Sequence, residues 1–191
     1  MVDVGVDTNC RQFRGVDGAV EAIPAPHLES NHPEADTRIC LNAIDADLSI
    51  QQPSEIVVTA SDPDVAVILL HHCHRMKSNM WMEVGNKGKG DRRFLNISAI
   101  AAEVGVGPMF CEALPGFHAY TGCDYTSSFV RKGKKRPLKI AEDNPDYLDA
   151  FSSLSTVEAD ERSCKIIEEY TAKIYGAKKL TSLNKHRLIR F

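Results

Sequence analysis

The stretch that decides the fold is EIVVTASDPDVAVILLHH, residues 55–72. Its first part, 55–60, is a short β-branched run, the pattern of a strand covered on both faces in a parallel sheet. Asp62 is placed to cap the next element and Pro63 to open it. That next element is either a helix or a second strand, because composition does not decide between them. The stretch therefore predicts a buried strand followed at once by acidic residues.

The segment upstream, NHPEADTRICLNAIDADL (31–48), carries a helix-start signature. Asn31 or His32 occupies the cap, Pro33 the first helical position, and acids fill the first turn. Apolar residues at helical spacing mark the face that we expect to be buried: Ile39, Ala43 and Ala46. Residues 1–29 show no clear periodicity, which predicts a lead-in or loop with at most one short strand.

Downstream, residues 79–84 and 92–97 flank the glycine-rich GNKGKGD (85–91), which predicts a hairpin or a longer β-loop. Trp81 and Phe94 on the two strands are expected to form a cross-strand core pair.

The remaining sequence is mostly helical in pattern. SAIAAEVG (98–105) predicts a short helix capped by Ser98, and LPGFHAYTGCDY (114–125) predicts a turn followed by another. Residues 145–175 read as helix, and the tail 183–191 as a last short helix. Helix, strand, helix, hairpin and helices in this order predict an α/β sandwich with a helical C-terminal part. We expect residues 30–140 to form the core and 141–191 a helical extension of the same domain.

Bulk properties exclude several classes of protein. The 191 residues are 43% hydrophobic and 26% charged, which favours a packed core over disorder. No apolar run approaches the roughly 20 residues that span a bilayer, and the N-terminus lacks a signal-peptide profile. Six scattered cysteines without a CxxC pair favour reduced thiols over a disulfide framework. We therefore expect a soluble, intracellular protein with no membrane partner.

Acidic residues stand at the edges of the predicted elements in three clusters: Glu34 with Asp36, Asp62 with Asp64, and Asp124 alone. In an open α/β sheet, ligands bind just beyond the carboxyl ends of the strands. Five converging oxygen donors would suit Mg²⁺ or Mn²⁺. Two such ions about 4 Å apart can activate a water and stabilise the leaving oxygen of a phosphodiester.

Three motifs in this order give the chain a family resemblance: EADTRI (34–39), TASDPDVAVIL (59–69) and GCDYTSSFVRKGKK (122–135). The chain resembles the flap-endonuclease and XPG-type structure-specific nucleases, whose catalytic cores are PIN-like. The resemblance covers roughly residues 30–140 and implies a PIN-like α/β/α sandwich with a mostly parallel central sheet and an inserted hairpin. It further implies an N-terminally truncated branch, because only about 30 residues precede Glu34.

The resemblance also implies roles for individual residues. Glu34 and Asp36 match the pair on the catalytic helix, Asp62 and Asp64 the pair after the central strand, and Asp124 the acid of the Gly-x-Asp-Tyr segment. In the family these ligate divalent metal, here Mg²⁺ or Mn²⁺, for hydrolysis of nucleic-acid phosphodiesters. The basic run that follows is expected to hold the backbone of DNA rather than RNA, through Arg131, Lys132, Gly133, Lys134, Lys135 and Arg136. Such a partner favours a nuclear location.

Simpler interpretations stay open for each motif. Glu34 and Asp36 can be first-turn acids favoured by the helix dipole, and Asp62 and Asp64 a cap and a turn. The basic run can be a solvated face or a nuclear-localisation patch. Because the expected first strands of the core are missing, the chain is either a fragment of a larger protein or a decayed copy. The alternative function is a non-catalytic nucleic-acid-binding or interaction module.

Overall fold

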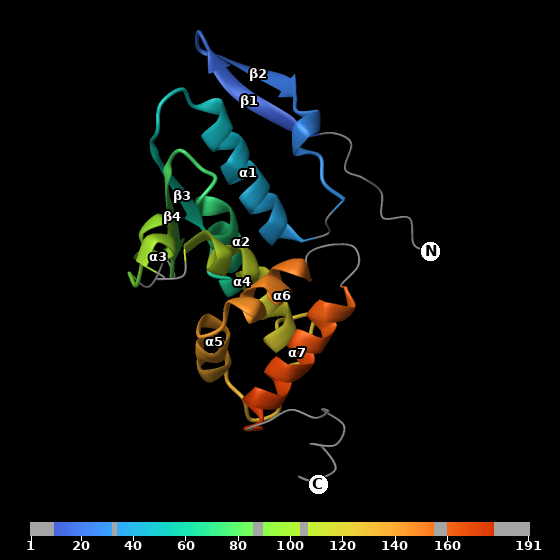
Figure 1. Cartoon of the computed structure of the whole chain (residues 1–191). Coiled ribbons are helices and arrows are strands. Elements are labelled where there is room, and N and C mark those ends of the chain that lie inside the picture. Colours follow the sequence, from blue (N-terminus) through green and yellow to red (C-terminus); the bar gives the residue numbers. More distant parts are fainter. Residues whose placement is uncertain (1–9, 32–33, 86–89, 104–106, 155–159, 178–191) are drawn as a thin grey trace. The chain divides into compact units, whose positions relative to one another are not determined.

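The computed structural model describes residues 10–31, 34–85, 90–103, 107–154 and 160–177 (Figure 1). The chain divides into two compact units. Unit 1 comprises residues 1–69 and 75–96, and unit 2 comprises 70–74 and 97–191. The described residues form a mixed α/β structure, as expected. The domain boundaries expected at residues 29 and 140 stay predictions.

Unit 1 contains two small sheets and the helices that accompany them. Its elements in chain order are β1 (Arg11–Val16), β2 (Ala19–Pro24), η1 (Pro26–Leu28), α1 (Ala35–Ser49), β3 (Glu55–Thr59), α2 (Pro63–Cys73, ending in unit 2), β4 (Asn79–Val84) and β5 (Arg93–Asn96). β1 and β2 pair antiparallel, whereas β3, β4 and β5 form a separate sheet in that order.

The three-stranded sheet is not mostly parallel. β3 pairs parallel to β4, but β4 pairs antiparallel to β5. The hairpin that the glycine-rich loop predicted is therefore confirmed. Its register places Trp81 opposite Asn96 and Phe94 opposite Glu83, so the expected Trp81–Phe94 pair is wrong. Phe94 is 52% exposed instead.

β3 is buried on one side only. Val58 is 7% exposed, whereas its neighbour Val57 is 50% exposed. Successive side chains point to opposite faces of a sheet. The expectation of a strand covered on both faces is thus wrong, although the strand itself lies where the β-branched run predicted it.

Residues 11–24 form a hairpin where the sequence led us to expect a loop or one short strand. Its turn is Asp17-Gly18, with φ angles of 48° and 80°. Both angles lie in the left-handed region that two-residue hairpin turns require. An Asp-Gly pair is a strong hairpin signal, and it marks this turn in the sequence.

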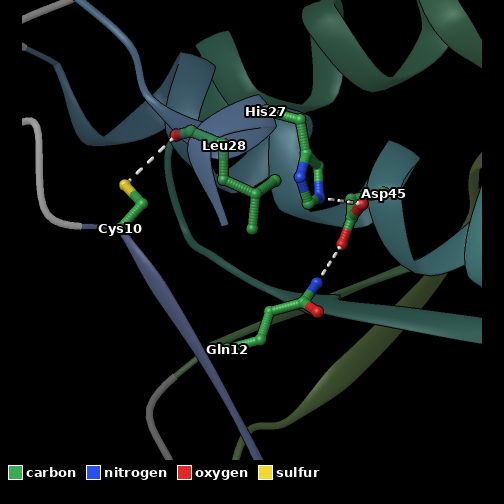
Figure 2. Close-up of polar contacts among 5 residues, drawn as sticks. All are labelled: Cys10, Gln12, His27, Leu28 and Asp45. Carbon is green, nitrogen blue, oxygen red and sulfur yellow. Dashed lines mark hydrogen bonds and ion pairs between the residues drawn. The ribbon is translucent and has the colours of Figure 1, made fainter. Parts of the chain in front are cut away.

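Side-chain contacts join this segment to α1 (Figure 2). Gln12 donates from Nε2 to Asp45 Oδ2 at 2.7 Å, and Asp45 Oδ1 lies 2.9 Å from His27 Nε2. The Cys10 thiol donates to the carbonyl of Leu28 at 3.4 Å, which closes the strand onto η1. Asp45 therefore fastens both the hairpin and η1 to the same point of α1.

α1 begins later than predicted, and of the three residues expected on its buried face Ala43 is buried, Ile39 is half-buried and Ala46 is exposed. Glu34 is its N-cap residue, and two of the three residues expected to start it, 32 and 33, lie outside the described residues. The buried residues of α1 are Cys40, Ala43 and Asp47, whereas Ala46 is exposed. α1 contacts β3, and the core of unit 1 also takes buried apolar side chains from α2 and β4: Val65, Leu69, Met80 and Met82.

Asp47 is a buried carboxylate at the C-terminal end of α1, only 2% exposed. Its two oxygens accept hydrogen bonds from the backbone N–H groups of Lys77, at 3.0 Å, and Ser78, at 2.9 Å. Ser78 in turn accepts through Oγ from the N–H of Ser54 at 3.1 Å. Burial alone would raise the pKa of Asp47, but these hydrogen bonds outweigh it and hold the pKa below its ordinary value of 3.8.

Unit 2 is helical, with α3 (Ile97–Glu103), α4 (Gly107–Thr121), α5 (Lys135–Glu142), α6 (Pro145–Ser153) and α7 (Glu161–Ile174). The turn expected at residues 114–116 is wrong, because α4 continues through Pro115. The helices expected within 145–175 are confirmed, and the tail 183–191 lies outside the described residues. Within the described ranges no single helix is long and apolar enough to cross a membrane. α3 and α4 would reach that length only together, across a 111° bend.

Two kinds of contact hold α4, α6 and α7 together: aromatic rings that pack edge-on, and a close approach of two helices at a glycine. Phe151 packs edge-on against Phe117 at 5.6 Å and Tyr170 at 4.9 Å between ring centroids. Gly116 lets α4 approach α6, because a Cβ built on it would lie 2.1 Å from the carbonyl oxygen of Phe151. The LPG sequence therefore serves helix packing rather than a turn.

We predict that Asp47→Asn destabilises unit 1 by about 3 kcal/mol, because an amide offers one acceptor to two buried N–H donors. The stabilisation by Asp47 is complete above the ordinary carboxyl pKa and is lost as pH falls through the lowered folded-state pKa. The variant should accordingly lose less stability than the wild type between about pH 6 and pH 3. Urea unfolding followed by the fluorescence of Trp81, the single tryptophan, measures this. Asp149→Asn, at an exposed position of α6, is the control, and equal losses in both variants would refute the role of Asp47.

Candidate functional site

Three of the five predicted carboxylates meet in unit 1. One oxygen each from Asp36, Asp62 and Asp64 lies within 4.8 Å of the other two. No other group of three or more His, Cys, Asp or Glu side chains in the described part of the chain is arranged so closely. All three side chains reach solvent at least in part. We call these three residues the acidic cluster.

The junction between β3 and α2 places two members of the cluster. β3 ends at Thr59 and α2 begins at Pro63, so Asp62 and Asp64 lie where the chain turns from strand to helix. One carboxylate oxygen of Asp62 accepts the N–H of Asp64 at 2.9 Å, which is the capping role that the sequence predicted. This bond fixes the Asp62 carboxylate relative to the backbone of Asp64 in the first turn of α2.

The third member, Asp36, is placed by the direction of α1. Asp47 ties the C-terminal end of α1 to Lys77 and Ser78, just before β4, and through Ser78 to Ser54, just before β3. α1 therefore runs antiparallel to β3. The helix from residue 36 to 47 is about 16 Å long at 1.5 Å per residue, and the chain from Ser54, beside the anchor, to Thr59 at the end of β3 also spans about 16 Å. These matched lengths bring the first turn of α1 to the carboxyl end of β3.

The electrostatics of the cluster favour a cation. Two carboxylates about 5 Å apart in water repel by roughly 1 kcal/mol. Asp36 and Asp64 lie in the first turns of α1 and α2, where the helix dipoles offset part of this repulsion. The negative charge of Asp36 is also felt one turn along α1 at Cys40, whose pKa is raised to about 12, first by burial and then by Asp36.

The donor set suits a hard divalent cation. All three ligands are carboxylate oxygens, and Mg²⁺ or Mn²⁺ prefers such oxygens together with waters. A structural zinc site would instead use Cys and His. The chain does have neighbouring histidines and a cysteine in HHCH (71–74), but His71 Nδ1 lies 3.3 Å from the carbonyl of Cys111 and His74 Nε2 lies 3.6 Å from Glu112.

Glu34 and Asp124 do not belong to this group of three. Glu34 is the N-cap residue of α1, and its carbonyl accepts the hydroxyl of Thr37 at 3.3 Å. Asp124 belongs to unit 2, so its expected convergence with the cluster stays a prediction. It lies in an exposed turn in which the N–H of Cys123 donates to Thr126 Oγ1 at 3.0 Å. Gly122 opens this turn at φ 109°, where a Cβ would meet Ser128 at 2.6 Å.

The basic run divides into inward and outward side chains. Lys134 Nζ lies 3.0 Å from the carbonyl of His118 and 3.2 Å from Thr121 Oγ1, so it neutralises the C-terminal end of α4. Lys132 Nζ lies 5.2 Å from the ring centre of Tyr175. The remaining members of the run are exposed: Arg131, Gly133, Lys135 and Arg136.

Asp47 is the supporting residue that our sequence analysis missed. It falls on the same helical stripe as Cys40 and Ala43, at i+7 and i+4. An acid on a stripe that is otherwise buried is the signal that could have identified it, because such a carboxylate must find hydrogen-bond donors.

Comparison of the chain with protein-family models, curated proteins and solved structures finds no match. The acidic cluster is therefore identified by its own geometry and by the order of the motifs that supply it.

We predict that Mg²⁺ or Mn²⁺ raises the melting temperature of the wild type above its value in EDTA. A hundredfold excess over Kd stabilises a protein by about 2.7 kcal/mol, which corresponds to roughly 5 °C or more. Asp64→Asn should abolish most of this rise while keeping the Asp62 cap, whereas Asp149→Asn should retain it. Differential scanning calorimetry measures the shift. An undiminished rise in Asp64→Asn would show that the cation binds elsewhere.

Proposed function

We propose that the chain is a divalent-metal-dependent nuclease that hydrolyses phosphodiesters of DNA, of the flap-endonuclease and XPG-like type. The observation that carries the proposal is the meeting of Asp36 with Asp62 and Asp64. These residues come from two separate motifs, and the sequence resemblance assigned both motifs to one metal site. Independent helix-start acids have no reason to converge at the carboxyl end of a strand. A PIN-like core is part of this proposal.

The acidic cluster would hold Mg²⁺ or Mn²⁺ through one oxygen of each carboxylate. Such an ion, when bound, would polarise a water for attack and offset negative charge on the phosphodiester. The protein's own contribution is positional. The Asp62 cap on the N–H of Asp64 and the anchoring of α1 by Asp47 position the backbone segments that carry the three carboxylates before substrate arrives, which reduces the reorganisation that catalysis requires.

The basic run would supply the contact with the nucleic-acid backbone. Its exposed members, Arg131, Lys135 and Arg136, can reach phosphates, and exposed Gly133 lets a phosphate approach backbone amides. Lys134 is not one of these phosphate contacts in this proposal, because its ammonium group already donates to the carbonyl of His118 at the end of α4. DNA in the nucleus remains the proposed setting.

A second candidate is a non-catalytic nucleic-acid-binding module. The observation that favours it is that the cluster contains three of the five expected carboxylates, while the exposed basic side chains need no metal to act. In this case binding would depend on salt and on the basic run, and not on Mg²⁺.

We predict that the chain cuts a labelled 5′-flap or single-stranded DNA in Mg²⁺ or Mn²⁺ but not in EDTA. Asp36→Asn and Asp64→Asn should each lower the rate by about 100-fold or more, because each removes a metal ligand. Gel analysis of the products over time measures this. Asp149→Asn, purified identically, should cut as the wild type does. Cleavage that is equal in all four proteins would belong to a contaminant and would refute the nuclease proposal.

We predict, for the basic run, that the double variant Lys135→Glu/Arg136→Glu weakens DNA binding in EDTA. The slope of log K against log salt should fall by about two, one for each phosphate that the variant no longer neutralises. Fluorescence anisotropy at several salt concentrations measures it. Arg162→Glu/Lys165→Glu on α7 changes the net charge equally at exposed positions and is the matched control. Equal weakening by both double variants would assign binding to net charge alone. Binding without cleavage would support the second candidate.

A further inference from the structure

β3 has a free edge in the part of the chain that the structure describes. It is the end strand of the three-stranded sheet, with β4 on one side. An edge strand presents a row of backbone N–H and C=O groups that can pair with another strand. This edge is independent of the acidic cluster and of the proposed nuclease function.

The backbone groups on this edge can be identified from two hydrogen bonds. The N–H of Asn79 donates to the carbonyl of Ser54 at 2.9 Å, and the N–H of Ala60 donates to the carbonyl of Glu83 at 3.1 Å. In a parallel pair, alternate residues of a strand bond to the same neighbour. Residues 54, 56, 58 and 60 therefore face β4. The N–H and C=O groups of Glu55, Val57 and Thr59 point to the free edge.

The same three residues are exposed to solvent, with Val57 50% exposed at their centre. The edge carries few of the features that usually block pairing, such as lysines or a proline within the strand. Its one charge is Glu55, whose carboxylate accepts from Asn79 Nδ2 at 2.9 Å and from the indole N–H of Trp81. These bonds hold the charge over its own sheet rather than over the edge.

We propose that β3 pairs antiparallel with β3 of a second copy of the chain, about a twofold axis at Val57. The two three-stranded sheets then become one of six strands. Val57 faces Val57 of the second copy, and Glu55 faces Thr59 of the second copy. All three outward residues exchange both of their hydrogen bonds in this arrangement, because each lies opposite another outward residue.

The sequence around β3 selects this register over its neighbours. A twofold axis at Glu55 would place two carboxylates opposite each other, which destabilises a sheet. It would also place Val57 opposite Pro53, which has no N–H to donate. An axis at Thr59 would pair Val57 with residue 61, beyond the end of β3. Of these three axes, the one at Val57 pairs apolar with apolar and places no like charges opposite each other.

Analytical ultracentrifugation of the full chain tests the association. We expect a concentration-dependent dimer whose Kd rises about tenfold or more in Val57→Lys and Val57→Pro. Val57→Pro removes an outward N–H without removing a β3–β4 hydrogen bond, and Trp81 fluorescence checks that the variant is folded. Val130→Lys, at a residue 74% exposed in unit 2, should dimerise as the wild type does. Equal Kd values in all variants would overturn the proposal.

Disulfide trapping tests the register. Directly opposed residues in such pairs have Cα atoms about 5.5 Å apart, within the range that a disulfide spans. Val57→Cys should crosslink to itself on oxidation, well above the wild-type background. Glu55→Cys alone and Thr59→Cys alone should not, whereas an equimolar mixture of the two should. A monomer with a Val57 amide protected from hydrogen exchange would show instead that another segment of the same chain occupies the edge, and would overturn the proposal.

Discussion

The position of α1 on the sheet depends on the buried carboxylate of Asp47. It binds two backbone N–H groups at the start of β4 and, through Ser78, reaches the start of β3. Because α1 also packs along β3, anchoring its C-terminal end beside the beginnings of the two parallel strands places its N-terminal end beside their carboxyl ends. A buried carboxylate without donors would be costly, so this arrangement is strongly specified. The acidic cluster is a consequence of that anchor.

The cluster combines stabilising local interactions with unfavourable mutual repulsion. Each acid is locally reasonable, since Asp62 caps α2 and Asp36 and Asp64 lie in first turns. Only their convergence is unexplained by local structure, and convergence is what a divalent cation requires. The basic run lies in unit 2, and part of it is already used by the protein, because Lys134 neutralises the end of α4.

Parallel strands are usually buried on both faces of their sheet. In unit 1, one face of the parallel β3–β4 pair is instead partly exposed to solvent. Val57 and Phe94 are about half exposed, and the hairpin adds Phe13, at 70% exposure. Unit 2, in contrast, closes a core of aromatic rings around Phe151 and Gly116. Association through β3 would satisfy the exposed backbone edge, which none of the strands in the described residues pairs with.

The sequence by itself determined the local elements: the β-branched run became β3, Asp62 capped α2, and the glycine-rich loop joined β4 to β5. Turn and cap chemistry acts within a few residues, so it can be read from the chain. Only the tertiary structure decided the strand order, the antiparallel β5, the exposure of Val57 and the continuation of α4 through Pro115. It also decided which acids meet, bringing Asp36 to Asp62 and Asp64 without Glu34. Those outcomes depend on contacts between residues distant in the chain, such as Asp47 with Ser78, that no local pattern encodes.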